Sequence, residues 1–382
     1  MSCEILSLLY SFGHRSESWL YWQISELKRY RVYVLTYEYK NPQEYPYPFI
    51  KILPISSKIT RYMLKMPLLI LERRRPRLDL RELFIISRII NQEKIKIIQA
   101  HFGWTGYRFL ELTSKFNLPY IVWFYGSDAF RSQYQAMVQE LINSPVIFCC
   151  TSNALKRRLE ELGCSGERVY VFHPGIRLPT QLPNKMFKHK EPLRIISIGR
   201  LTDVKDPCAL VKIAKILQEK GIDFTWQHFG DGDLRPMVEA EIAKHNLTNR
   251  FFLLGERPNE QVLEALKFAD VMVHNAVIAP DGGREAFGFV LVEASAFGVP
   301  VVSVRVGGIP EIVQDQKTGF LLDEGDIEGM AEKVILLAKN PELREQFGRE
   351  AYRFASQKFD LNSQIKKLEE FYDQLIKKQN QI

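Results

Sequence analysis

The chain has 382 residues, of which 46% are hydrophobic, and a formal net charge of +7. This length favours two domains of about 150 to 200 residues over a single core, and the apolar content excludes a disordered chain. No stretch reaches the roughly 18 uninterrupted apolar residues of a membrane span, and the opening MSCEILSLLYSF is expected to form a strand rather than a signal peptide.

Strand-like and helix-like segments alternate through the first half of the chain. The expected strands are 4–11, 32–39, 49–54, 94–101, 119–126, 145–152 and 168–175. The expected helices are 16–30, 80–92, 105–116, 134–144 and 153–163. Such alternation predicts an α/β fold with a parallel, doubly wound sheet, in which ligands bind beyond the carboxyl ends of the strands.

Polar residues and glycines at that edge of the first sheet are candidates for binding an acceptor. Taken singly, each is more often a structural polar residue than a functional one. The candidates are Gly13, His14, Glu17, His101, Tyr125, Asp128 and His173.

Residues 56–90 carry nine Lys or Arg and only three acidic residues, with apolar residues interleaved. A basic, partly amphipathic segment favours an anionic membrane surface. A solvated charged loop is an equally good interpretation. Nucleic acid is not expected as a partner, because no nucleic-acid-binding motif accompanies the charge.

Residues 173–192 contain four prolines and no apolar periodicity, and we expect a domain linker there. Two domains, 1–172 and 193–340, would flank it, and helices are expected over 341–382. In the second half the alternation restarts: the expected strands are 193–199, 223–230, 250–255, 270–276, 301–304 and 318–322, and the expected helices are 206–221, 234–246, 259–269 and 327–339, with one more beginning near Phe289.

Two loops after strands of the second half have the composition of a phosphate site. Gly199 ends one strand, and Arg200 and Lys205 follow before a helix, which suits a diphosphate. Gly230 and Asp231 form a second loop at the same edge. Neither GxxxxGK[ST] nor a GxGxxG after the first strand is present, which argues against a P-loop nucleotidase and a dinucleotide dehydrogenase.

The stretch DGGREAFGFVLVEASAFGVPVVSV carries two glutamates, Glu285 and Glu293, with seven residues between them. Gly288 suits a tight turn, and a helix starting near Phe289 would direct free N–H groups at an anion. A carboxylate before that helix and another inside it could each accept hydrogen bonds from a sugar or a ribose. Two solvated glutamates on a capped surface helix are the simpler alternative.

In this order, SIGRLTDVKD, HFGDGDL, ADVMVHNA, DGGREAFGFVLVEASAFGVPVVSV and VGGIPEIVQDQKTGFLL resemble glycosyltransferase family 4. SESWLYWQI and AHFGWTG resemble its exopolysaccharide, capsule and colanic-acid branch more loosely. The resemblance implies the GT-B fold: two Rossmann-like domains facing across a cleft, with the last helices (341–382) packing back on the first domain and closure about the linker.

The resemblance also implies roles for single residues. Arg200 and Lys205 stand where the family holds the donor diphosphate, and Glu285 stands where it holds the donor sugar. Glu293 stands where it holds the ribose. Contacts to sugar and phosphate are implied for the backbone of Phe287, Gly288 and Phe289.

One position departs from the family pattern. The family often has His-Gly-x-Asp where this chain has Tyr125-Gly126-Ser127-Asp128. Tyrosine donates a hydrogen bond but carries no proton charge near neutral pH. Either Tyr125 substitutes sterically, or His101 or His173 assists, or activity is weak.

The resemblance implies a retaining transfer of a sugar from a nucleotide diphosphate sugar to a glycan or lipid-linked acceptor hydroxyl, in surface polysaccharide or glycolipid synthesis. No metal and no other cofactor is expected, since no Asp-x-Asp site is well placed. The alternatives are a non-catalytic or partner-dependent subunit and a sugar-nucleotide epimerase on the same fold. The five cysteines show neither metal spacing nor a disulfide framework, so a cytoplasmic location is expected, with peripheral attachment to the inner face of the membrane through 56–90.

Overall fold

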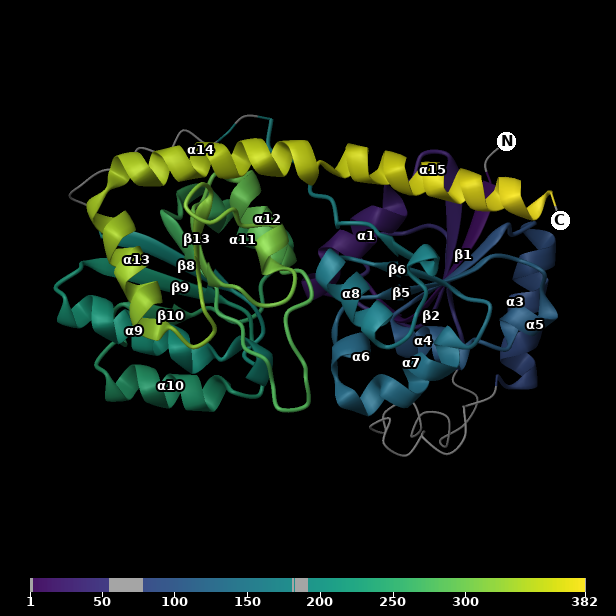
Figure 1. Ribbon diagram of the computed structural model, residues 1–382, viewed down its shortest axis with the longest axis horizontal. Coiled ribbons are helices and arrows are strands. Elements are labelled where there is room, and N and C mark those ends of the chain that lie inside the picture. Colours follow the sequence, from purple (N-terminus) through teal and green to yellow (C-terminus); the bar gives the residue numbers. More distant parts are fainter. Residues whose placement is uncertain (1–2, 55–77, 181, 183–191, 382) are drawn as a thin grey trace. The chain divides into compact units, whose positions relative to one another are not determined.

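The computed structural model describes residues 3–54, 78–180, 182 and 192–381. Most of the basic segment and half of the expected linker lie outside these ranges. The chain divides into two compact units: unit 1 is residues 1–175 together with 361–382, and unit 2 is residues 176–360. Figure 1 shows the course of the chain through both units.

Unit 1 contains a parallel sheet of seven strands in the order β3-β2-β1-β4-β5-β6-β7. Alternating apolar strands and helices favour this arrangement, because each crossover helix covers a face of the sheet. The strands are β1 (Cys3–Phe12), β2 (Tyr30–Tyr39), β3 (Ile50–Ile52), β4 (Ile97–His101), β5 (Tyr120–Phe124), β6 (Ile147–Cys150) and β7 (Val169–Val171). The helices are α1 (Ser18–Ser25), α3 (Leu80–Gln92), α4 (Gly103–Arg108), α5 (Leu112–Lys115), α6 (Ser127–Phe130), α7 (Gln135–Ile142), α8 (Asn153–Glu161) and α15 (Leu361–Gln379).

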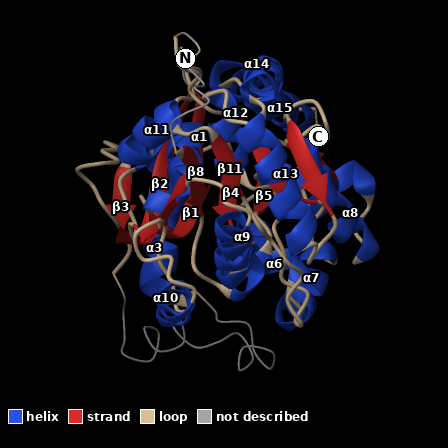
Figure 2. Ribbon diagram, turned by 90° about the vertical axis from the view of Figure 1, so that its left-hand side faces the viewer, coloured by secondary structure: helices blue, strands red, loops and turns tan. Residues whose placement is uncertain are grey.

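Unit 2 repeats the architecture with six strands in the order β10-β9-β8-β11-β12-β13. The strands are β8 (Leu193–Ile198), β9 (Phe224–Phe229), β10 (Phe251–Leu253), β11 (Val271–Val273), β12 (Val301–Val304) and β13 (Gly319–Leu322). The helices are α9 (Pro207–Glu219), α10 (Arg235–Lys244), α11 (Asn259–Phe268), α12 (Phe289–Ala296), α13 (Ile327–Lys339) and α14 (Pro341–Lys358). In Figure 2 the strands are flanked by helices, as in a doubly wound fold.

The helices after residue 340 divide between the units. The 18-residue helix α14 belongs to unit 2, where it packs on α12, and the 19-residue helix α15 belongs to unit 1. A buried network fixes α15 there: the Tyr372 hydroxyl donates to Gln99 Oε1 at 2.8 Å, and the same oxygen accepts from Trp123 Nε1 at 3.1 Å. The helices expected together over 341–382 therefore have different partners.

Two expected helices differ in the structure: the one over 105–116 is divided into α4 and α5, and the one over 16–30 is shortened. The helix expected over 16–30 spans only Ser18–Ser25, and Tyr30 begins strand β2. Tyr30 is buried, its ring contacts the ring of Tyr372, and its hydroxyl donates to Asp373 Oδ1 at 2.5 Å. Packing against α15 thus outweighs the local helical periodicity, and Tyr30 adopts a strand conformation.

Candidate functional site

The two glycine loops of unit 2 lie against each other at the carboxyl ends of β8 and β9. The Gly199 N–H donates to Phe229 O at 2.9 Å, and the Leu201 N–H donates to Asp231 O at 3.0 Å. Gly230 has a φ of +133°, and a Cβ there would lie 1.9 Å from Gly199 O, so only glycine fits. The sequence placed these loops at one edge, and the structure brings them into contact.

A buried chain of hydrogen bonds fixes the Gly199 peptide. Trp226 Nε1 donates to Ser197 Oγ at 2.9 Å, and Ser197 Oγ lies 2.8 Å from His228 Nδ1. The Gly199 carbonyl can only accept, so His228 Nε2–H donates to Gly199 O at 3.1 Å, and Nδ1 of the neutral ring accepts the Ser197 proton. The next N–H, that of Arg200, points the opposite way across the trans peptide, away from His228.

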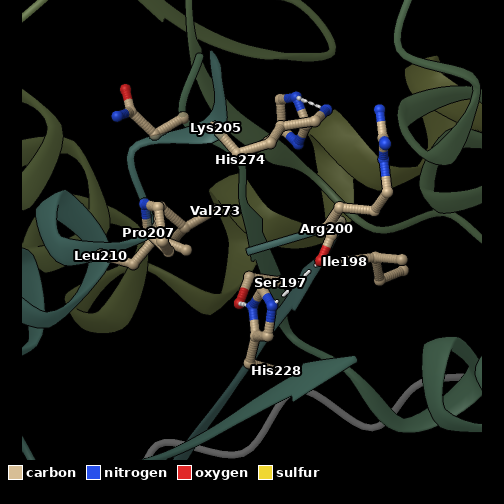
Figure 3. A pocket seen from close by; sticks show the side chains of 11 residues that line it. Ser197, Ile198, Arg200, Lys205, Pro207, Leu210, His228, Val273 and His274 are labelled. Atoms are coloured by element: carbon tan, nitrogen blue, oxygen red, sulfur yellow. Dashed lines mark hydrogen bonds between the residues drawn. The ribbon is translucent and has the colours of Figure 1, made fainter. Parts of the chain in front are cut away.

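A pocket opens beside these loops (Figure 3). Arg200 at its edge is exposed, whereas the Lys205 side chain is only 20% exposed. In Figure 3 the Lys205 and His274 side chains meet, and Arg200 extends toward the same side. The lining residues are Ser197, Ile198, Gly199, Arg200, Lys205, Pro207, Leu210, His228, Val273, His274 and Asn275.

Lys205, Glu285 and His274 form one cluster. The Lys205 ammonium donates to Glu285 Oε2 and lies 3.3 Å from His274 Nε2, which is itself 3.6 Å from Glu285 Oε2. Burial by itself would raise the pKa of Glu285, but the charge of the facing Lys205 ammonium outweighs it and lowers that pKa. Glu285 is therefore a carboxylate at neutral pH, poised to accept hydrogen bonds.

The backbone after Glu285 is held by two glycines that the sequence analysis did not select. A Cβ on Gly307, whose φ is +55°, would lie 1.6 Å from Glu285 O, and one on Gly308 would lie 2.2 Å from Ala286 O. Gly288 has a φ of +88° and is the N-cap of α12, with Phe289 as the first helical residue. Phe287 is buried against Phe359, so its side chain packs in the core of unit 2.

Glu293 lies inside α12 and is 3% exposed. The side-chain amide of Asn259, the first residue of α11, donates to its Oε1 at 2.8 Å. Burial raises the pKa of Glu293 to about 7, and the Asn259 hydrogen bond only partly offsets this. Asp231, the last of the expected donor residues, is exposed and pairs with Arg235 at 3.0 Å.

In unit 1 three of the acceptor candidates form one cluster, in which His101 and Asp128 are buried and Tyr125 is half-buried. His101 Nδ1 lies 2.6 Å from the Tyr125 hydroxyl, and Asp128 accepts backbone N–H bonds from Gly103 at 2.9 Å and Gly126 at 2.8 Å. Burial lowers the pKa of His101 to about 3 and raises that of Asp128 to about 6. His101 is therefore neutral at physiological pH.

The remaining acceptor candidates are more dispersed. His14 follows β1, and its Nε2 lies 2.7 Å from Ser11 Oγ. Gly13 has a φ of +84°, and a Cβ there would lie 2.2 Å from Lys40 O. Glu17 ends a 3₁₀ turn ahead of α1. The pKa of Tyr125 is raised mainly by burial and then by the charge of Asp128, and Glu17 makes a smaller contribution in the same direction. His173 follows β7, at the opposite edge of the sheet from β3.

Sequence reasoning missed His274, His228 and Asn259. His274 and His228 are polar residues within apolar strand segments of unit 2, near the carboxyl ends of the strands, so the edge rule applied to the first half would have selected them in the second. Asn259 gave no such signal, because only folding brings it to Glu293. Among the described residues, no group of three or more His, Cys, Asp or Glu side chains is arranged to hold a metal ion.

Sequence comparisons agree with the architecture. A family model described as "Glycosyl transferases group 1" matches residues 180–354, and one described as "Glycosyltransferase Family 4" matches residues 25–178. The parallel Rossmann-like units and these two matches, which together span most of the chain, define a glycosyltransferase of the GT-B type. The chain belongs to the family-4 and group-1 glycosyltransferases.

Two curated relatives and one solved structure illustrate the likeness. The amylovoran biosynthesis glycosyltransferase AmsK of Erwinia amylovora is 29% identical over 64% of this chain and 61% of its own length. The N-acetyl-alpha-D-glucosaminyl L-malate synthase of Bacillus anthracis is 32% identical over 54% of this chain and 51% of its own length, so the chain spans little more than half of these relatives. The crystal structure of Anabaena Alr3699/HepE in complex with UDP has a TM-score of 0.74 at 18% identity, covering 97% of this chain and 100% of that one.

Proposed function

We propose that this protein transfers a sugar, with retention of configuration, from a nucleotide diphosphate sugar to a hydroxyl of a glycan or lipid-linked acceptor. The observation that carries the proposal is the Lys205–Glu285–His274 cluster beside the N-terminus of α12. It places an ammonium and an ionised carboxylate together, next to the exposed Arg200. The similarity to the amylovoran biosynthesis glycosyltransferase AmsK supports exopolysaccharide synthesis, and the similarity to the UDP complex of HepE supports a nucleotide donor.

Each group has a defined task in this proposal. Lys205 and Arg200 bind the diphosphate and stabilise the charge that develops on it as the glycosidic bond breaks, an effect worth about 3 kcal/mol per donor. Glu285 accepts hydrogen bonds from the donor sugar, and Glu293 accepts them from the ribose. The departing phosphate oxygen takes the acceptor proton on the same face of the sugar, so we propose that the transfer needs no metal.

The donor site is tested by thermal unfolding with a panel of UDP-, GDP-, ADP- and TDP-sugars. Ligand at about 100 times its dissociation constant adds roughly 2.7 kcal/mol to the free energy of unfolding. We expect one nucleotide class to raise the melting temperature of the wild type and to have little effect on Glu293→Ala. If none stabilises the wild type, the donor assignment is wrong, whereas stabilisation without turnover would favour the partner-dependent subunit.

We propose in addition that unit 1 attaches to an anionic membrane surface. Of the basic segment, only residues 78–90 are described: α3 exposes Leu80 (85%) and Phe84 (68%) beside the exposed Arg81 and Arg88. No helix among the described residues combines the length and apolarity needed to cross a membrane. We expect Leu80→Gln with Phe84→Gln to reduce co-sedimentation with phosphatidylserine vesicles, and undiminished binding would contradict the attachment.

A further inference from the structure

His274 follows β11 directly, at the floor of the donor pocket. Its backbone N–H donates to Val302 O at 3.0 Å, and its side chain is 3% exposed. The backbone position is therefore fixed by the sheet, and the imidazole has little room to turn. Figure 3 shows the ring against the end of the Lys205 side chain.

The partners of the ring determine where its proton lies. Lys205 is a donor without a lone pair, so His274 Nε2, 3.3 Å from the ammonium, meets it as an acceptor. The backbone of Ile198 raises the pKa of the ring, which is the effect of a carbonyl facing a ring N–H. The acceptor Glu285 Oε2 also faces Nε2, but at 3.6 Å it lies beyond hydrogen-bond distance, whereas the ammonium lies within it. The Lys205 contact therefore places the electron pair on Nε2 and the proton of the neutral ring on Nδ1.

Lys205 needs such a fixed acceptor. Its ammonium is a compact charge at the end of a flexible four-carbon stem, with three N–H groups to place. One N–H is directed to Glu285 and a second to His274, which leaves the third for a ligand in the pocket. Without His274, the ammonium would be oriented by Glu285 alone, the group that has to accept the donor sugar.

We propose that His274 is a positioning residue for the transfer reaction: its unprotonated Nε2 holds the Lys205 ammonium toward the diphosphate while Glu285 engages the sugar. This inference rests on the proposed function, since it assigns the diphosphate to Lys205. It goes beyond that function by making the neutral Nδ1–H tautomer of a buried histidine a condition for catalysis.

The charges around the ring imply a pH dependence. Lys205 and His228 carry or can acquire positive charge near His274, whereas Glu285 is the facing anion. Burial and then Lys205 lower the pKa of His274, while Glu285 and the Ile198 backbone raise it, and the net direction is downward. Acidification places a second cation 3.3 Å from the ammonium, displaces Lys205, and removes activity on the acid side of the pH profile.

Two variants separate the proposed role from a structural one. His274→Gln keeps an acceptor oxygen near the position of Nε2 and cannot be protonated. We expect it to retain kcat within about threefold at pH 8 and to lose the acid limb that the wild type shows. His274→Leu fills the space but accepts no hydrogen bond, and we expect kcat to fall about tenfold or more with a smaller change in the dissociation constant of UDP. His245→Gln, at the end of α10, is the matched control and should behave as wild type.

The tautomer can be measured without any turnover. ¹⁵N chemical shifts of the imidazole in the ligand-free protein at pH 7.5 should show a protonated Nδ1 and an unprotonated Nε2 for His274. An Nε2–H tautomer or an imidazolium at that pH would overturn the inference while leaving the proposed function intact. So would wild-type kcat in His274→Leu, or an unchanged acid limb in His274→Gln. If the wild type neither binds UDP nor hydrolyses UDP-glucose or another sugar nucleotide, the proposed function fails, whatever the tautomer is.

Discussion

The loop at Glu285 and the interior of helix α12 at Glu293 place the same side chain in opposite environments. Glu285 faces the Lys205 ammonium and His274, and its pKa is lowered despite burial. Within the described part of the chain, Glu293 accepts a hydrogen bond from the Asn259 amide and faces no cation, and its pKa is raised to about 7. Burial is common to both, so the presence or absence of a cation decides the protonation state.

This difference suits two different tasks. A carboxylate that stays ionised over the whole working range can accept hydrogen bonds from a reacting sugar at any of these pH values. A carboxyl group that ionises near pH 7 becomes a full acceptor for a ribose diol only above that value. We therefore expect nucleotide binding to strengthen as pH rises through about 7, while the ionisation of Glu285 stays unchanged.

The largest expected effect comes from removing the Lys205 ammonium that faces Glu285. Lys205→Ala should lower kcat for donor consumption by about 10²- to 10³-fold, because it removes one electrostatic stabiliser of the leaving diphosphate. It should also make Glu285 resemble Glu293, with a raised pKa. Steady-state rates against pH test both points, and Lys215→Ala, in an exposed pair with Glu219 on α9, is the control. An unchanged kcat in Lys205→Ala would contradict the claim that the Lys205 charge gives Glu285 a different role from Glu293.

Replacing the second carboxyl group should remove a pH dependence of stability. In the folded protein Glu293 binds its proton up to about pH 7, whereas in the unfolded chain it releases it near 4.5. Its contribution is thus complete below pH 4.5 and declines as pH rises toward 7, by about 3 kcal/mol. Urea unfolding at pH 5 and pH 8 should show this loss in the wild type and a smaller one in Glu293→Gln. Equal losses in both proteins would show that Glu293 ionises normally.

The close contact between Gly307 and the Glu285 carbonyl can be disturbed without changing any side chain of the Lys205–Glu285–His274 cluster. In Gly307→Ala the new methyl group would meet Glu285 O, and the residue would keep an unfavourable positive φ, so we expect about 2 kcal/mol of destabilisation together with reduced activity. Gly325→Ala is a matched control, because Gly325 has a φ of +81° with nothing within 4 Å of the added Cβ. It should share the strain and keep full activity. If the two variants have equal activity, the contact between Gly307 and Glu285 is unimportant.

The smallest effect is expected at Asn259. Asn259→Ala removes the amide donor to Glu293 and should lower the free energy of unfolding by about 1 kcal/mol at pH 8. At pH 5 the loss should be smaller, because a neutral carboxyl group gains less from a donor. Denaturation at the two pH values checks this difference. A loss that is independent of pH would mean that Asn259 does not interact with the ionised form.

The fold followed from the sequence because its signals are local. Alternating apolar strands and periodic helices lie in contiguous segments, and the parallel sheets of both units match them. Tyr30 and the division of the last helices between the units did not follow, since contacts with distant residues decide both. The GT-B assignment came from motif order, which is also contiguous.

Only part of the site could be predicted from the sequence. Gly199, Lys205 and Glu285 stand in recognisable motifs, but His274 is 69 residues from Lys205, and Asn259 is 34 residues from Glu293. Whether a carboxyl group is charged depends on such partners and on burial, neither of which a motif records. The same limit applies to Tyr125. Its hydroxyl contacts the fully buried His101, whereas the sequence could only suggest that His101 assists Tyr125.

The most direct test of the donor site is the release of nucleoside diphosphate from sugar nucleotides, measured for the wild type, Glu285→Gln and Lys205→Ala with the same UDP-, GDP-, ADP- and TDP-sugar panel. We predict that the wild type releases the diphosphate from one nucleotide class, slowly to water and faster with a glycan acceptor, and that both variants lose at least 99% of this activity. Wild-type release rates in the variants would contradict the assignment of Lys205 and Glu285 as the reacting centre.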